Sequence, residues 1–176
     1  MKIIVANPDA RADLLLASFL SVKLGGPLLY VSGQEGLSQV NQTVASNDVK
    51  EILFVSSEEN LDPSIEEKFS QKGLRTQWIH GEDPYILSVE IAKEFFPDST
   101  EFILLNPEFP EEGISAPSIG SKKNAALLYV QKDTIPTSVL EFLKIRECRH
   151  FHILASDKAI SSNVEDALNQ IYTIDF

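Results

Sequence analysis

The sequence has a single cysteine, Cys148, so no disulfide bond can form within the chain. It also lacks any apolar run close to the roughly 18 residues that a membrane-spanning helix requires, so no membrane insertion is expected. No basic, signal-like segment opens the chain, which passes directly into the apolar residues 3–5. The sequence as it stands therefore predicts a cytoplasmic protein. The alternative is a cell-surface protein from which an N-terminal signal has been removed.

Positive charge is scarce, because 15 lysine and arginine residues stand against 26 aspartate and glutamate residues, for a net charge of −11. This balance excludes a broad basic face, so nucleic acid is not an expected partner. The sequence also has no glycine-rich phosphate-binding loop and no G-x-S-x-G nucleophile motif. We therefore expect no cofactor and predict no catalytic residue.

An internal repeat with a period of 99 residues is the strongest pattern in the sequence. Without a gap, the block LLYV at 28–31 aligns with LLYV at 127–130, and Asn7-Pro8 aligns with Asn106-Pro107. An identical four-residue block within one ungapped frame indicates that the chain contains two copies of one unit.

Short, continuous apolar runs predict strands that are covered on both faces, as in parallel sheets. We expect these strands at residues 3–6, 27–32, 51–55, 76–79, 101–105, 126–130 and 150–155, with a further candidate at 171–175. Apolar residues three and four apart predict helices between them, as at Leu15, Phe19 and Val22.

Strict alternation of strand and helix predicts an α/β fold with two tandem Rossmann-like lobes, mainly parallel sheets and internal duplication. Residues 1–98 would form the first lobe with a connecting strand and helix, and residues 99–176 the second. The repeated leucines of the LLYV blocks are expected on central strands, in the core.

Short motifs also recur in a fixed order along the chain. An acidic residue precedes an apolar segment at Asp13 and again at Glu112. The later motifs are LLY at 28–30 and 127–129, GEDPY at 81–85 and AISSNVE at 159–165. In order and spacing these motifs resemble the cell wall binding repeat type 2, which occurs in tandem in surface-layer and cell-wall proteins. Where that family has Gly-Gly, this chain has Ser56-Ser57 and Ala155-Ser156.

The resemblance implies a non-catalytic binding or assembly module whose partner is a cell-wall or surface polymer. It points to ligand contacts at Asp13, Glu112, Gly81, Asp83 and Tyr85. The repeated leucines would mediate the packing of one repeat against another; these are Leu28, Leu29, Leu127 and Leu128. Since the family's repeats work in sets of three and this chain has two, we expect an unmatched apolar surface and a homo-oligomer, most simply a homodimer.

Ligands of open parallel sheets bind at the carboxyl ends of the strands, which adds Asn7 and Asn106 to the candidate ligand contacts. A structural role is open for each candidate. An asparagine before proline often starts a turn, and Asp13 and Glu112 stand where helix caps are expected.

Three further residues suggest a different chemistry. Cys148, His150 and His152 alternate, so on a strand they would share one face, as zinc or copper ligands can. The first copy has no equivalent set and a fourth ligand is not evident, so we predict no metal site. The favoured interpretation of Trp78 is a core residue, and a platform for a sugar ring is the alternative.

The leading interpretation is therefore a binding module similar to cell wall binding repeats. The alternative is a cytoplasmic α/β protein on the same scaffold that binds a different small ligand or a protein partner. An uncharacterised enzyme is the third hypothesis.

Overall fold

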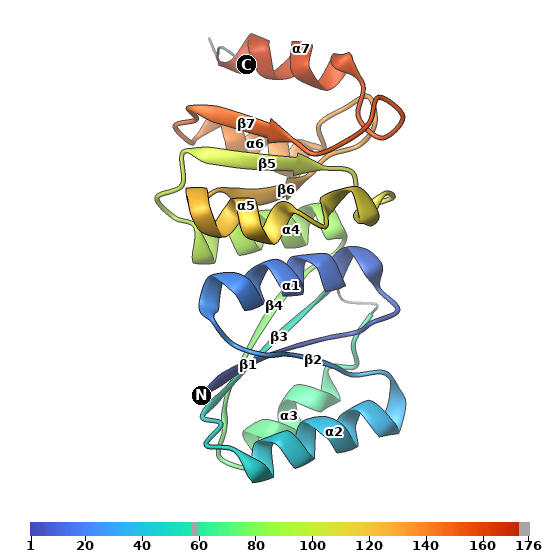
Figure 1. Ribbon diagram of the computed structural model, residues 1–176, viewed down its shortest axis with the longest axis vertical. Coiled ribbons are helices and arrows are strands. Elements are labelled where there is room, and N and C mark those ends of the chain that lie inside the picture. The colour runs from blue at the N-terminus through green and yellow to red at the C-terminus, as the bar shows by residue number, and fades with distance from the viewer. Residues whose placement is uncertain (58–59, 173–176) are drawn as a thin grey trace. The chain divides into compact units, whose positions relative to one another are not determined.

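The computed structural model describes residues 1–57 and 60–172 (Figure 1). The chain forms two compact units, Met1–Asp83 and Pro84–Phe176. Helix α4 (Pro84–Phe95) therefore packs with the second unit, although its sequence belongs to the connection after the first repeat. The repeat boundary at 98/99 stays a prediction about the duplication. No helix within the described residues has the length and apolar character needed to cross a membrane.

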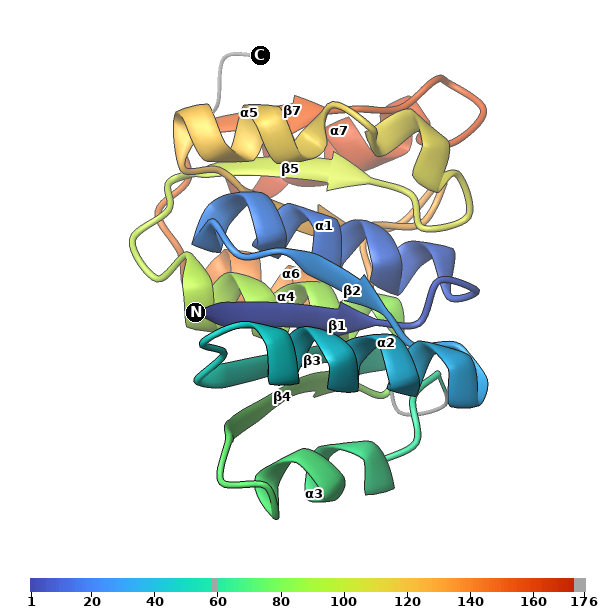
Figure 2. The same cartoon turned by 60° about the horizontal axis from the view of Figure 1, so that its bottom comes forward.

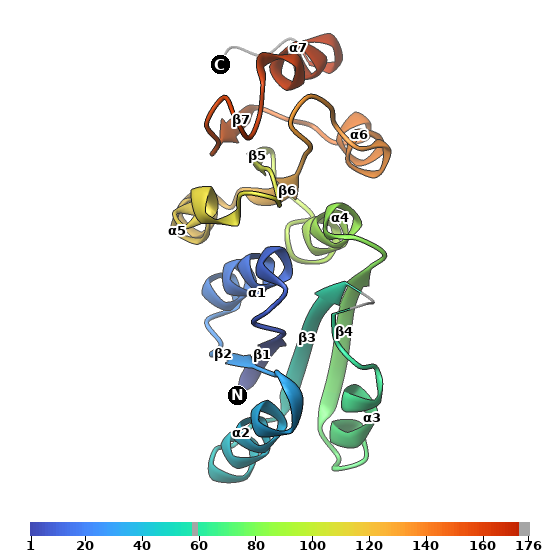
Figure 3. The ribbon, with the colours of Figure 1, turned by 90° about the vertical axis from the view of Figure 1, so that its right-hand side faces the viewer.

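The first unit contains a parallel sheet with the strand order β2-β1-β3-β4. Its elements are β1 (Lys2–Ala6), α1 (Arg11–Leu24), β2 (Leu28–Tyr30), α2 (Gly33–Ser46), β3 (Glu51–Ser57), α3 (Ser64–Ser70) and β4 (Arg75–Gly81). Helix α1 covers one face of the sheet, and α2 and α3 lie on the other face (Figure 3). This arrangement explains the continuous apolar runs, because both faces of the inner strands are buried.

The core of the first unit follows the two-residue period of its strands. Ile3 of β1 and Phe54 of β3 point toward α2 and α3 and share one buried cluster with Phe69. The alternate residues Ile4 and Leu53 are also fully buried and point toward the other face of the sheet, which α1 covers.

The second unit has a three-stranded parallel sheet with the order β6-β5-β7. After α4, its elements are β5 (Glu101–Leu105), the 3-10 turn η1 (Pro110–Gly113), α5 (Ala116–Lys123), β6 (Ala126–Tyr129), α6 (Thr137–Lys144), β7 (His150–Ile153) and α7 (Ser162–Ile171). Helix α5 lies beside β5 (Figure 2) and packs on both β5 and β6, whereas α4 packs against β6 and α6. The strand expected at 171–175 lies mainly outside the described residues, and Ile171 itself ends α7.

The two units repeat each other in strand order and in register. Ile3 pairs with Ile52 in the first sheet, and Phe102 pairs with Phe151 in the second, each 99 residues further on. The pairing of Ile4 with Leu28 recurs in the same way as Ile103 with Leu127. The predicted α/β fold with two parallel sheets is confirmed.

The expectation that the LLYV blocks form central strands is wrong. Strands β2 and β6 are edge strands, because the second strand of each unit pairs with the first alone. Leu28 and Leu29 are consequently only partly buried, whereas Leu127 and Leu128 are fully buried. The difference arises because α4 covers β6.

Helix α4 also satisfies a hydrogen-bonding group of that edge strand. The Ser88 hydroxyl of α4 accepts a hydrogen bond from the backbone N–H of Tyr129 (3.1 Å) and donates one to the carbonyl of Tyr85 (2.7 Å). Ser88 and Tyr129 are both fully buried. One polar side chain thus lets the apolar helix cover strand β6 without leaving that donor unpaired.

Candidate functional site

Asp13 is buried, with 1% of its surface exposed, at the point where α1 faces the carboxyl end of β3. Its Oδ2 atom accepts hydrogen bonds from the Ser57 backbone N–H (2.8 Å), the Ser57 hydroxyl (3.1 Å) and the Asn60 side-chain amide (3.0 Å). The carboxylate therefore connects α1 to Ser57, the last residue of β3, and to Asn60.

Glu112 occupies the equivalent position in the second unit and forms the equivalent bonds. One carboxylate oxygen accepts from the Ser156 backbone N–H (2.8 Å) and the other from the Ser156 hydroxyl (2.7 Å). Ser57 and Ser156 stand at positions where the resembled family carries glycine, so these serines add a hydroxyl donor that glycine lacks. The carboxylates of Asp13 and Glu112 therefore have a structural role, because each connects its own segment to a serine 44 residues further along the chain.

Asn7 and Asn106 form a second symmetric pair at the ends of β1 and β5. The Asn7 amide donates to the carbonyl of Asn60 (2.7 Å), and the Asn106 amide donates to the carbonyl of Ala159 (2.8 Å). Each side-chain oxygen also accepts from the backbone N–H two residues further on, at 2.9 and 3.0 Å. This turn geometry agrees with the structural interpretation of the Asn-Pro pairs, and a ligand role for either asparagine stays a prediction.

The strand ends of the first unit enclose a small polar pocket of about 290 Å³. The polar side chains that line it are Asn7, Ser32, Asn60, Asp62 and Lys68. The pocket lies where ligands of parallel sheets bind. Asn7 is the one predicted contact among its lining residues, and its hydrogen-bonding groups are engaged within the protein.

The remaining predicted ligand contacts are close in sequence, at the end of β4 and the start of α4. Gly81 is buried at the end of β4, Asp83 immediately precedes α4, and Tyr85 is in the first turn of that helix. The backbone carbonyl of Tyr85 accepts a hydrogen bond from the Ser88 hydroxyl within the second unit. A ligand role for these three residues also stays a prediction.

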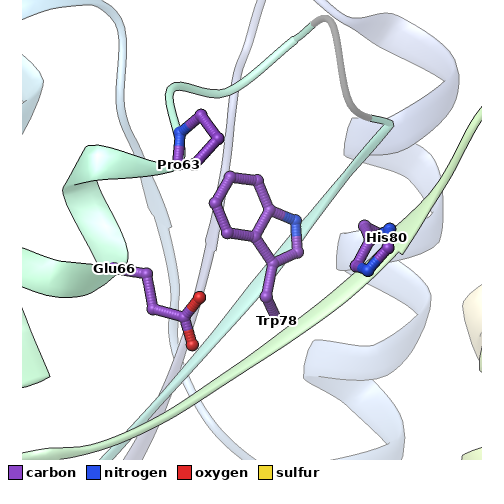
Figure 4. Close-up of a pocket in the computed structure, with 4 residues that line it drawn as sticks. All are labelled: Pro63, Glu66, Trp78 and His80. Carbon is purple, nitrogen blue, oxygen red and sulfur yellow. The ribbon is translucent and has the colours of Figure 1, made fainter.

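A second pocket of the first unit, of about 570 Å³, lies between α3 and β4 (Figure 4). Trp78 and His80 line it from one face of β4, since they are two residues apart on the strand. Pro63 and Glu66 line it from the start of α3. The chain thus brings an aromatic ring, an imidazole, a carboxylate and a proline ring to one cavity.

Trp78 contributes to both the core and this pocket. On one side its ring packs against Phe54, with centroids 6.2 Å apart and ring planes inclined by 43°. The other side faces the pocket, where Figure 4 shows the indole close to Pro63 and to the Glu66 carboxylate. The indole Nε1 is buried and has no hydrogen-bond partner among the residues that the structure describes. The core interpretation of Trp78 agrees with this packing, and a role as a platform for a sugar ring stays a prediction.

Pro63 and Glu66 were not among the predicted site residues. Glu66 carried a sequence signal, since it aligns with Glu165 in the 99-residue repeat frame. Glu165 lies exposed on α7. No strand of the described part of the second unit corresponds to β4, so the aromatic wall of this pocket belongs to the first unit.

The rings of His150 and His152 lie side by side, with centroids 4.4 Å apart, but with Cys148 they do not form a metal-binding group in the described part of the chain. The His152 ring bonds to the Glu101 carboxylate (2.8 Å), and the Cys148 thiol lies 3.7 Å from the carbonyl of His150. Burial raises the pKa of Cys148 to about 11, which disfavours the thiolate that metals bind. Within residues 1–57 and 60–172, no group of three histidine, cysteine or acidic side chains has a metal-binding arrangement.

The Glu101–His152 contact predicts a specific dependence of stability on pH. The hydrogen bond from His152, with a smaller effect of Lys123, lowers the pKa of Glu101 below its ordinary value of 4.5. A carboxylate with a lowered folded-state pKa stabilises the protein above its unfolded-state pKa, and this contribution disappears as the pH falls through the folded-state value. Stability from Glu101 should therefore be complete above about pH 4.5 and decline below it.

The variant Glu101→Gln should have a lower free energy of unfolding at neutral pH and a shallower loss of stability below about pH 4.5. Urea unfolding at a series of pH values measures both effects. Removing the partner in His152→Ala should produce the same shallower slope. An unchanged slope in both variants would contradict the assignment to this pair.

Comparison with known proteins confirms the family resemblance. Residues 79–165 match the family model described as Cell wall binding domain 2 (CWB2). This segment runs from β4 into α7. A curated relative, the amidase enhancer of Bacillus subtilis (strain 168), is 24% identical over 127 residues, which are 72% of this chain and 18% of the relative.

Two solved structures have the same fold. Cwp6 from Clostridium difficile superposes with a TM-score of 0.82 at 15% identity, over 98% of this chain and 28% of its own. Cwp8 from the same organism superposes with a TM-score of 0.80 at 22% identity, over 97% of this chain and 29% of its own. The chain spans less than a third of the length of each of these relatives.

Proposed function

We propose that this chain, whose residues 79–165 match the cell wall binding domain 2 family, is a non-catalytic module that binds a cell-wall polymer at the cell surface. The family match carries the proposal, because it runs from the end of β4 into α7 and so includes strands β5, β6 and β7. The internal hydrogen bonds of Asn7, Asp13, Asn106 and Glu112 support the non-catalytic part. These residues hold loops and helices in place through bonds within the fold, although Oδ1 of Asp13 is buried without a hydrogen-bond partner among the described residues.

The charge of the chain constrains how such a polymer is bound. With a net charge of −11, general electrostatic attraction opposes binding to a polyanion. Affinity must then come from short-range contacts with parts of the polymer that carry no negative charge. Such binding should depend little on salt, because screening acts mainly on long-range charge interactions.

Co-sedimentation with purified Bacillus subtilis cell walls tests this function. The folded chain should pellet with the walls in a saturable manner, and raising the salt from about 0.15 M to about 1 M should leave most of it bound. The same chain unfolded in urea and diluted immediately before mixing is a control with identical charge. A folded chain that stays in the supernatant at both salt concentrations would refute wall binding.

We also propose that the isolated chain self-associates, most simply as a homodimer, because it leaves large apolar side chains exposed. Large apolar side chains are well exposed, among them Ile114 and Ile145 at 79% and Tyr30 at 50%. Sedimentation equilibrium at micromolar concentration and about 0.15 M salt should give a mass above the 19.6 kDa of one chain. A single species at the monomer mass would contradict self-association and leave wall binding untouched.

A further inference from the structure

We propose that the pocket formed by Pro63, Glu66, Trp78 and His80 binds a pyranose unit of a glycan that carries no negative charge. The inference rests on the proposed function in so far as that glycan belongs to the cell wall. It locates the binding site in the first unit and defines the class of ligand.

The Trp78 ring is held rigidly enough to serve as a binding surface. Its inner side packs on Phe54, which is fully buried in the core of the first unit. Its outer side borders the pocket (Figure 4). The C–H groups on one face of a pyranose ring form a flat apolar surface, which gains dispersion and hydrophobic contact on an aromatic ring. An already ordered ring loses little conformational entropy on binding.

The remaining walls suit the edge of a sugar. The half-buried Glu66 carboxylate lies beside the indole, where it can accept hydrogen bonds from hydroxyl groups or from an amine (Figure 4). The exposed His80 ring adds a polar group on the same face of β4, and Pro63 adds a second apolar wall. The volume of about 570 Å³ falls within the range of known ligand pockets.

The same side chains disfavour anionic ligands. Glu66 would repel a phosphate or carboxylate at short range, and the net charge of −11 adds to the repulsion. A carboxylate next to an aromatic face instead favours a neutral or amine-bearing group. The buried Nε1 atom means that Trp78 contributes its ring surface to binding.

The repeat supplies a matched control for this site. Glu66 and Glu165 are equivalent in the repeat frame, but Glu165 lies exposed on α7 and has no counterpart of Trp78 beside it in the described strands of the second unit. Neutralising Glu66 should therefore weaken glycan binding, and neutralising Glu165 should have no effect.

Trp78 is the single tryptophan of the chain, so its fluorescence reports on this pocket alone. The chain is titrated with tetraglucosamine, with its uncharged N-acetylated form, and with poly(glycerol phosphate). The two glycans should change the emission in a saturable manner, and the anionic polymer should not. If neither glycan changes the emission, or if only the anionic polymer does, the inference is wrong.

Variants separate a direct contact from a general effect. Glu66→Gln should weaken binding by about tenfold or more, the cost of losing a hydrogen bond to a charged group, whereas Glu165→Gln should bind normally. Trp78→Ala, followed by calorimetry, should bind up to about tenfold more weakly. Circular dichroism confirms that each variant is folded, and Trp78→Phe, which keeps an aromatic platform, should retain most of the affinity.

The outcomes for the site and for the function are distinguishable. If the chain pellets with cell walls but Glu66→Gln and Trp78→Ala pellet equally well, wall binding stands and this pocket is not its site. If the glycans alter the Trp78 emission but the chain does not pellet with walls, the sugar pocket stands and the wall-binding function fails.

Discussion

Replacing Leu128 by alanine should lower the free energy of unfolding by about 2–5 kcal/mol, which is the usual cost of a large-to-small substitution in a packed core. Leu128 is fully buried, because α4 covers the edge strand β6. The equivalent Leu29 has the same sequence neighbours, but it lies partly exposed on β2. The change Leu29→Ala should therefore cost about half as much or less.

Urea unfolding followed by circular dichroism measures both variants. The single tryptophan gives a second signal that is confined to the first unit, so Leu29→Ala can be followed there directly. A loss below about 1 kcal/mol in Leu128→Ala would mean that the block is not part of the core. Equal losses in the two variants would mean that burial by α4 does not set the difference.

This pair of leucines also marks how far the sequence predicts the fold. The continuous apolar runs and the 99-residue repeat frame correctly predicted parallel strands and a common register for the two units. They could not show that β2 and β6 lie at the sheet edges, because strand order is set by contacts distant in sequence. Nor could two identical LLYV blocks reveal that one of them is covered by a helix from the preceding connection.

The helix that follows the first strand shows a second limit of the repeat frame. In the first unit α1 runs unbroken from Arg11 to Leu24, whereas the aligned segment forms η1 and then α5. Pro117 lies at the start of α5 and Gly113 ends η1, so each falls where the segment changes geometry. Neither residue suits a helix interior, which explains why the aligned segment divides there.

The candidate site was predictable only in part. Symmetry within the repeat singled out Asp13 and Glu112, and the structure gives both the same type of serine partner 44 residues away. The sequence could not identify that partner, because the contact depends on how helix and strand pack. The same holds for the sugar pocket, since Pro63 and Glu66 reach Trp78 only when α3 docks beside β4.

Replacing Asp13 by alanine should lower the free energy of unfolding by about 3 kcal/mol, because several buried donors lose their acceptor together. The Ser57 N–H, the Ser57 hydroxyl and the Asn60 amide all donate to one carboxylate oxygen of Asp13. Ser57 is itself only 4% exposed, so water cannot easily replace the missing oxygen at that position. A buried carboxylate is costly in itself, and its Oδ1 has no hydrogen-bond partner among the described residues, but the three donors that point at Oδ2 offset part of that cost.

Glu112→Ala is the matched comparison and should cost about 1 kcal/mol or less. Glu112 forms the same two bonds to Ser156, but it is half-buried and Ser156 is exposed, so water can take the place of the carboxylate. Asp13→Asn, which keeps one acceptor oxygen, should fall between the two alanine variants. Urea unfolding of the three variants decides the matter. Equal losses of unfolding free energy for Asp13→Ala and Glu112→Ala would show that burial does not set the contribution of these carboxylate–serine hydrogen bonds. A loss near zero for Asp13→Ala would show that the desolvation cost of the carboxylate cancels the stabilisation from its hydrogen bonds.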